Sequence, residues 1–159
     1  MGRLAARAAP LPLFIFGGWS SLITLKRYSH ETETVKMGRG FFEGWPNPPT
    51  EEVHRRILGE SYLALVAIDT DKNEIVGFVN AVSDGVLSAY LPLLEVLPAY
   101  RGRGIGTLLV KAMLEELQDL YMVDLCCDQR LQSFYERLGM TRSCGMICRN
   151  YLAQGGKTT

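Results

Sequence analysis

The sequence has no long hydrophobic run, no excess of charge of either sign, and few cysteines or histidines. No apolar stretch approaches the ~20 residues that a membrane span needs, so we expect no transmembrane segment and no membrane partner. The 17 basic and 17 acidic side chains cancel, and beyond residue 30 there are 13 basic residues against 17 acidic ones. Because a nucleic-acid binder presents a basic face, this balance argues against nucleic acid as a partner.

The four cysteines are poorly spaced for a disulfide framework or a zinc site: Cys126, Cys127, Cys144 and Cys148. Neighbouring residues of a strand point to opposite faces, which separates the first two thiols. We therefore expect buried free thiols in a reducing compartment, a cytoplasmic location and no metal. His54 follows the polar side of its predicted helix, beside two arginines, and is expected to be solvated.

At 159 residues the chain is long enough for one well-packed domain and too short for two. We place that domain at 21–155, with an N-terminal extension over 1–20 and a tail over 156–159. The extension is basic and ends in an apolar stretch, Leu13 to Phe16, which is shorter than the ~7 to 15 residues of a signal-peptide core. A transit peptide and an upstream extension of the reading frame both remain open.

Hydrophobic patterns along the chain predict a mixed α/β order. Strands are expected over 22–25, 62–69, 74–82, 90–97 and 122–127, with a further candidate over 147–152. Helices are expected over 29–38, 50–59, 105–117 and 131–138. The hairpin around residues 71–73 is antiparallel, whereas the helical crossover after residue 97 makes its flanking strands parallel. Three aromatics and three prolines fill Phe41 to Pro49, which predicts a structured loop.

A glycine-rich run lies between the fourth strand and its following helix: Arg101-Gly102-Arg103-Gly104-Ile105-Gly106. The first N–H groups of a helix lack intrahelical partners and favour a small anion, and glycine lets that anion approach closely. The spacing matches neither a dinucleotide fingerprint nor the lysine-containing loop of nucleoside triphosphatases. One interpretation is a phosphate cradle, and the other is a tight strand-to-helix turn with no ligand.

The segment from Leu94 to Gly106 resembles the central acyl-CoA-binding motif of the GNAT N-acetyltransferase superfamily. An apolar strand, a proline shortly after it, the Arg-x-x-Gly-x-Gly loop and an amphipathic helix appear in that order. A second segment, Leu125 to Met140, is similar to the family's strand, turn and helix ending in Phe-Tyr-x-x-x-Gly-Phe. The resemblance implies a mostly antiparallel twisted sheet, flanked by helices, whose central parallel pair splays apart around the pantetheine arm of coenzyme A.

The resemblance also implies an acetyl-CoA-dependent N-acetyltransferase that acts on a primary amine of a small molecule or peptide by direct attack. A homodimer is compatible with it, and a non-catalytic acyl-CoA sensor or interaction module is the alternative. By resemblance the oxyanion donor is a main-chain N–H at the irregular end of the strand, and we assign it to Val96. Asp128 stands where the family often has Asn, with the ability to cap the next helix. The residues expected to bind the cofactor are Leu94, Val96, Arg101, Gly102, Arg103, Gly104, Ile105, Gly106, Thr107 and Asp128.

Two side chains are candidates for the chemistry of acyl transfer. Tyr135 matches the family's general acid toward the departing sulfur, although its helical spacing is also compatible with simple packing. Glu95 is the only charge in an apolar run, where desolvation raises the pKa of a carboxyl and suits it to accept a proton. Its alternatives are an open face or pairing with Arg101 or Arg103.

The resemblance places the amine acceptor between Phe41 to Pro49, including Trp45, and the end of the chain. An aromatic wall for an amine is one interpretation of this loop. A proline-stiffened loop that packs only on its own core is the other. The sequence shows no acidic cluster that would attract a polyamine or an aminoglycoside, so the class of acceptor stays open.

Overall fold

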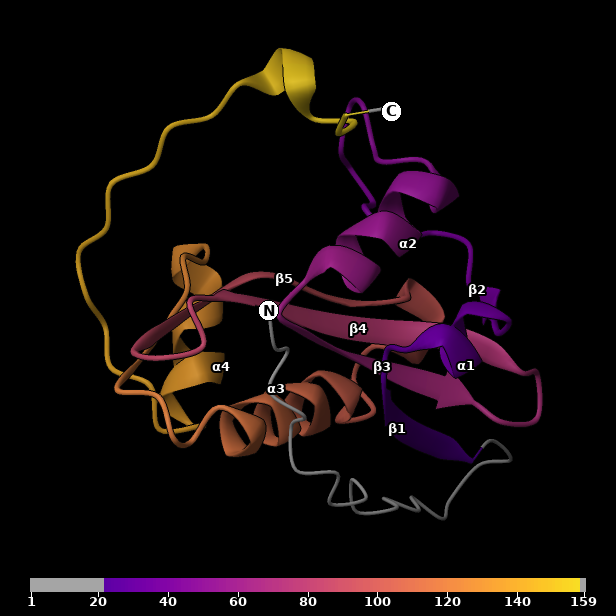
Figure 1. Ribbon diagram of the computed structural model, residues 1–159, viewed down its shortest axis with the longest axis horizontal. Coiled ribbons are helices and arrows are strands. Elements are labelled where there is room, and N and C mark those ends of the chain that lie inside the picture. Colours follow the sequence, from indigo (N-terminus) through magenta and orange to yellow (C-terminus); the bar gives the residue numbers. More distant parts are fainter. Residues whose placement is uncertain (1–21, 158–159) are drawn as a thin grey trace.

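The structure, a computed structural model, describes residues 22–157 (Figure 1). The predicted extension over residues 1–20 lies outside the described residues. The described residues form a six-stranded sheet in the order β1-β3-β4-β5-β6, with β2 paired to β4. The strands are β1 (Ile23–Arg27), β2 (Lys36–Met37), β3 (Leu63–Asp69), β4 (Glu74–Ser83), β5 (Ser88–Val96) and β6 (Met122–Asp124). The β1-β3-β4-β5 ladder is antiparallel and β5 runs parallel to β6, which confirms the expected fold class.

The helix α3 (Ile105–Glu116) covers one face of the sheet (Figure 1). The residues predicted to form its inner face are all buried: Ile105, Leu108, Leu109, Ala112, Met113 and Leu117. Gly77 of β4 lets this helix approach, because a Cβ there would lie 3.2 Å from a methyl group of Leu109. Local periodicity and one small residue therefore fix the helix on the sheet.

The helix α2 (Glu51–Glu60) and the loop before it cover the opposite face. Thr50 caps α2 as predicted, since its hydroxyl accepts a hydrogen bond from the Val53 N–H at 3.3 Å. Phe42, Leu58 and Phe78 lie in the apolar cluster between the helix and the sheet. The two layers thus enclose β3 and β4 from both sides.

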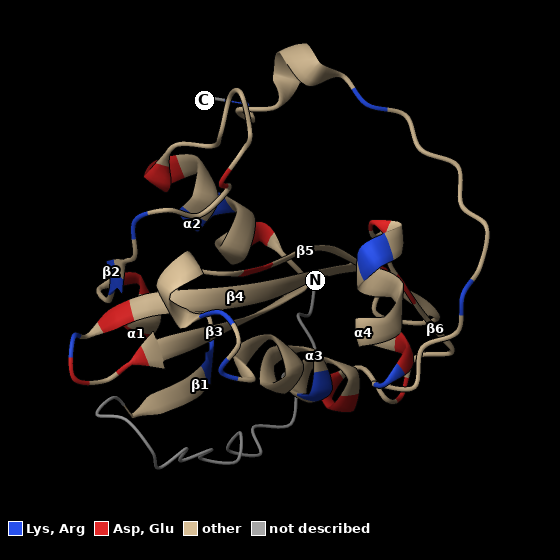
Figure 2. Cartoon of the chain, turned by 180° about the vertical axis from the view of Figure 1, so that it is seen from behind, with Lys and Arg blue, Asp and Glu red and all other residues tan. Residues whose placement is uncertain are grey.

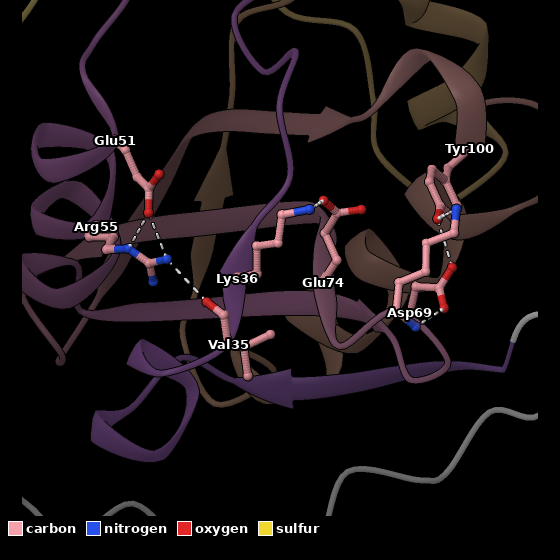
Figure 3. Close-up of polar contacts among 8 residues, drawn as sticks. Val35, Lys36, Glu51, Arg55, Asp69, Glu74 and Tyr100 are labelled. Carbon is pink, nitrogen blue, oxygen red and sulfur yellow. Dashed lines mark hydrogen bonds and ion pairs between the residues drawn. The ribbon is translucent and has the colours of Figure 1, made fainter.

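The predicted helix over residues 29–38 is wrong beyond its first turn. Ser29 begins a short helix, α1 (His30–Glu33), and the chain then forms β2 instead. The edge of β4 supplies the competing partner, because Lys36 pairs with Glu74 at 2.8 Å (Figure 3) and the Gly38 N–H donates to the Ile75 oxygen at 3.0 Å.

The last predicted strand, over residues 147–152, is also wrong. Residues 141–150 have no helix or strand, and a short 3₁₀ turn follows at Tyr151–Ala153. A strand needs a neighbour that accepts its backbone bonds, whereas the bonds here are local ones around Asn150. The chain leaves the short helix α4 (Gln132–Glu136) and its end returns to the loop before α2 (Figure 1).

The cysteines are free, but the prediction that they are buried is wrong. Cys126, Cys144 and Cys148 are exposed and Cys127 is half-buried. The reason is that β6 ends at Asp124, before the first pair, and the second pair lies in the irregular stretch after α4.

Charged positions of both signs are interspersed over the elements (Figure 2). Within residues 22–157, no helix is long and apolar enough to cross a membrane. Within the same range, no cluster of three or more His, Cys, Asp or Glu side chains could hold a metal ion.

Candidate active site

The glycine-rich loop joins the end of β5 to the start of α3, as predicted. Gly102 and Gly104 have φ values of +75° and +80°, a conformation that L side chains rarely adopt. A Cβ at either position would meet no other atom within 4 Å, so the conformation rather than crowding requires glycine here. The loop ends at the N-cap of α3, where Gly104 offers no side chain to the first N–H groups. These donors and the open surroundings fit a phosphate group.

The two arginines of the loop do not lie symmetrically beside it. Arg101 donates from Nε to the Val96 oxygen at 3.0 Å and from Nη1 to Glu43 at 2.8 Å, so it links the loop to β5 and to the segment before α2. Arg103 lies over the ring of Tyr100, with its guanidinium carbon 5.0 Å from the ring centre. Ile105 is buried, so only its backbone can face a ligand, whereas Thr107 is half-buried in the first turn.

The strand β5 has an open edge next to this loop. It pairs with β6 over only three residues, Ser88 to Tyr90, and no strand of the described chain lies on that side further along. The Leu97 N–H donates to the Val76 oxygen at 2.9 Å. Because antiparallel pairs alternate, the backbone groups of Leu94 and Val96 then point away from β4, toward the open edge. The Val96 oxygen is reached there by Arg101, in agreement with this alternation.

The expectation that Val96 lies at the irregular part of the strand is wrong. Val96 pairs regularly with Gly77, and the irregularity of β5 falls between the pairs of Asn80 and Val82. Pro92 lies in that interval and explains the shift, since proline has no N–H for the ladder. The outward direction of the Val96 N–H therefore comes from strand alternation and not from a bulge.

Glu95 lies between these two residues and faces the other cover of the sheet. Its Oε2 accepts the N–H of Phe42 at 2.7 Å, and the side chain is half-buried. Burial raises the pKa of the Glu95 carboxyl above its ordinary value, against the opposing effects of the Phe42 N–H and of Arg101. Glu95 is neither on an open face nor hydrogen-bonded to an arginine of the loop within the described contacts.

The loop of Phe41 to Pro49 is structured, as predicted, and Phe42 is its anchor. Phe42 is buried, although its φ of +59° is uncommon for a residue with a side chain. Its ring packs edge-on against Trp45 at 5.3 Å between centres, and Trp45 remains partly exposed. At the other end of the loop, the Asn47 N–H donates to Gln154 at 3.0 Å. The loop therefore lies between Glu95 and the C-terminal segment.

His54 is not solvated, which corrects the prediction from its neighbours. It is buried to 2% exposure among the rings of Phe41, Phe42 and Phe78, at centre distances of 5.2, 4.9 and 4.5 Å. Burial, followed by the nearby charge of Arg55, lowers the pKa of His54 to about 4, so the ring is neutral near pH 7. At 100° per residue, position 54 falls between positions 57 and 58 of the helix, and this spacing could have revealed its burial.

Tyr135 lies on α4, the helix near the open edge of β5. A Cβ on Gly106 would lie 3.8 Å from the ring of the adjacent Phe134 and 3.9 Å from Val96. Burial, followed by the charge of the nearby Cys127 thiol, raises the pKa of Tyr135 to about 12. The phenol consequently keeps its proton at physiological pH and can donate a hydrogen bond.

Asp128 does not cap a helix, contrary to expectation. It is exposed and its side chain pairs with Arg130 at 3.3 Å instead. Only its backbone oxygen supports the following 3₁₀ turn, by accepting from the Leu131 N–H at 2.8 Å.

A sequence model of the GNAT acetyltransferase family matches residues 31–140, which contain the loop, β5 and α4. The chain belongs to this family.

Relatives of known structure and sequence agree with this assignment. A crystal structure of a candidate acetyltransferase from Deinococcus radiodurans R1 is 44% identical, with a TM-score of 0.78 over 86% of this chain and 94% of that one. N-alpha-acetyltransferase 30 of Schizosaccharomyces pombe is 32% identical over 76% of this chain and 85% of its own. An uncharacterized N-acetyltransferase, ycf52, of Gracilaria tenuistipitata var. liui is 26% identical over 60% of this chain, which spans only 54% of that protein.

Membership of the GNAT family gives the geometry of β5 a direct interpretation. One strand presents backbone groups of alternate residues at the open edge, and the residue between them, Glu95, faces the Phe42 segment. The open edge and the aromatic loop are therefore faced by adjacent residues of the same strand.

Proposed function

We propose that the protein is an acetyl-CoA-dependent N-acetyltransferase that acts on a primary amine of a small molecule or peptide by direct attack. The observation that carries this proposal is the alternation along β5. The N–H groups of Leu94 and Val96 point to the open edge, whereas the Glu95 carboxylate faces the aromatic loop. A thioester at the open edge and an amine at the aromatic loop would thus be separated by only one residue along β5.

Coenzyme A, when bound, supplies an acetyl group on a good thiolate leaving group. The N–H groups at the start of α3 and around Gly102 and Gly104 would hold its diphosphate. The Val96 N–H is proposed to stabilise negative charge that develops on the acetyl oxygen, because a fixed donor needs no reorganisation during the reaction. Leu94 and Thr107 would line the path between these two points.

Glu95 is proposed to take the proton that the amine loses when its nitrogen bonds to the acetyl carbon. A raised pKa makes the carboxylate a better base than an exposed glutamate, and it faces the acceptor side. Tyr135 is proposed to donate a hydrogen bond to the sulfur as the carbon–sulfur bond breaks. With a pKa of about 12, it shares its proton with the departing thiolate rather than surrendering it completely.

The acceptor is proposed to be a neutral or singly charged amine with an apolar body, which suits the exposed part of Trp45. The similarity to a protein named N-alpha-acetyltransferase 30 supports testing peptide α-amines beside small aromatic amines. The cytoplasmic location belongs to the same proposal, and the four free cysteines support it.

The test is to incubate the protein with acetyl-CoA and a panel of aromatic amines and peptides, while following thiol release and thermal stability. We expect stabilisation by coenzyme A and amine-dependent thiol release. Stabilisation without release on a broad panel would favour an acyl-CoA sensor. The absence of any stabilisation by coenzyme A would overturn both interpretations.

A further inference from the structure

Tyr100 is the only buried side chain between residues 98 and 104, the stretch that connects β5 to α3. It ends the short 3₁₀ turn that follows β5, and its N–H donates to the Leu97 oxygen at 2.8 Å. Every other side chain of this stretch is exposed. Tyr100 therefore packs the start of this connection into the domain core, ahead of the buried Ile105 that begins α3.

The hydroxyl of Tyr100 joins the loop to the turn between β3 and β4 (Figure 3). It donates to Asp69 Oδ2 at 2.6 Å and accepts from Lys72 Nζ at 2.8 Å. Asp69 has no exposed surface, and Tyr100 is only 4% exposed. A charge-assisted hydrogen bond between two buried groups is stronger and more directional than a surface contact.

Asp69 also shapes the turn to which it belongs. Its other oxygen, Oδ1, accepts the N–H groups of Asp71 at 3.0 Å and Lys72 at 3.1 Å. The turn closes through Asn73 with a φ of +48°. The Asp69 carboxylate therefore holds both the β3–β4 turn and the Tyr100 hydroxyl in place.

Two cations lie close to the ring of Tyr100. The Lys72 ammonium is 5.1 Å from the ring centre, and the Arg103 guanidinium is 5.0 Å from it. The ring thus sets the position of Arg103, a residue of the loop, relative to the hairpin. Cation–π contacts of this length are attractive, which favours one arrangement of the loop over others.

We infer that Tyr100 is a positioning residue for the diphosphate of coenzyme A, held by Asp69 and Lys72, and that the β3–β4 turn is thereby part of the cofactor site. This inference rests on the proposed function. Gly102 and Gly104 have no side chains to hold the loop, and glycine has the most backbone freedom to lose when a loop is ordered. Binding an anion to a loop that is already ordered avoids the ordering cost that a free loop would incur.

The test uses Tyr100→Phe, which keeps the ring and removes the hydroxyl. We expect coenzyme A to bind about three- to tenfold more weakly by calorimetry, as loss of one ordering contact predicts. The KM for acetyl-CoA rises by the same factor while kcat stays within about twofold, since the residue does not touch the reacting atoms. Turnover of S-acetylpantetheine, which lacks the phosphates, should not change. A variant whose fold is damaged would lose activity on both substrates.

A second variant, Lys72→Ala, tests the inference even if Tyr100→Phe does not fold. Lys72 is exposed, so its replacement should not disturb the core. It should weaken coenzyme A binding in the same direction as Tyr100→Phe. The matched controls are Lys111→Ala, an exposed lysine of α3, and Tyr121→Phe, an exposed phenol, both of which should bind as the wild type does.

Two results would overturn the inference. One is a folded Tyr100→Phe protein that binds coenzyme A as tightly as the wild type. The other is an equal loss of activity on acetyl-CoA and on S-acetylpantetheine. Failure of the wild-type protein itself to bind coenzyme A would overturn the proposed function as well, so the two failures are distinguishable.

Discussion

The two covers of the sheet are built in different ways. On one face, a single continuous helix, α3, buries a regular set of apolar side chains. On the other face, the cover combines the Phe41 to Pro49 loop, α2 and the returning C-terminal segment. That second face also contains the buried atoms His54 Nε2 and Asn80 Oδ1, which have no hydrogen-bond partner within the described chain.

This difference separates the two tasks proposed for the domain. The α3 face carries the glycine-rich loop, which we propose holds the cofactor. The opposite face carries the loop proposed to bind the acceptor, and its shape depends on contacts between segments far apart in the sequence, such as Phe42 with Glu95. Irregular, loop-rich surfaces on a rigid sheet are where specificity is commonly found. Three substitutions test which of the two sides contributes to the reaction and which contributes only packing.

The largest effect is expected from Tyr135→Phe on the cofactor side. Loss of the hydroxyl removes the hydrogen bond to the departing sulfur, so kcat should fall on the order of tenfold to a thousandfold. The KM for acetyl-CoA should change little, because the ring still packs beside Phe134. Steady-state kinetics with a responsive amine measures both values. Unchanged turnover would remove Tyr135 from the mechanism and leave it a packing residue.

The fold of the α3 side could be predicted from the sequence because its signals are local. The inner face of α3 follows from apolar residues at helical spacing, and the loop before it was expected from the glycines at the start of the helix. Even so, the sequence did not show that Arg101 contacts Glu43, because these residues are 58 positions apart. The Asp69–Tyr100 bond was missed for the same reason.

The acceptor side was predicted less completely. A structured loop over Phe41 to Pro49 was expected from its prolines and aromatics, but not its attachment to Glu95 or to Gln154. The burial of His54 was missed because its arginine neighbours suggested a polar face, although its helical spacing placed it within the apolar stripe. Composition identifies such a loop, whereas tertiary contacts decide what it covers.

The second largest effect is expected from Glu95→Gln, at the residue where the two sides meet. The carboxylate must be ionised to accept a proton, and its pKa is raised by burial. The wild-type kcat/KM should therefore fall as pH decreases through a pKa above that of an ordinary glutamate. Glutamine still accepts the Phe42 N–H, but it cannot act as a base, so activity near pH 8 should fall on the order of a hundredfold.

A pH profile of kcat/KM checks this prediction. Ionisation of the amine substrate gives its own acidic limb in every variant. The additional limb that belongs to Glu95 should disappear in Glu95→Gln and persist in Glu43→Gln, which changes an exposed carboxylate of the neighbouring loop. A Glu95→Gln protein with the wild-type profile would show that water or another group accepts the proton. The acceptor side would then contribute only binding.

The smallest effect is expected from His54→Leu, which tests the unusual packing of the acceptor side. The folded protein holds the pKa of His54 at about 4, below its ordinary value of 6.5, so folding disfavours the protonated ring. The associated stability is complete above pH 6.5 and is lost as the pH falls from there toward 4. Between pH 7 and pH 5 this one group should lower the free energy of unfolding by about 2 kcal/mol.

Urea denaturation at the two pH values measures the effect. Leucine cannot be protonated and removes the unpartnered Nε2, so His54→Leu should lose less stability on acidification than the wild type. His30→Leu is the control, because the His30 side chain is 98% exposed and its removal should leave the pH dependence intact. If His54→Leu kept the full acid sensitivity, a different group would be responsible. The buried imidazole would then not determine how the stability of the α2 face depends on pH.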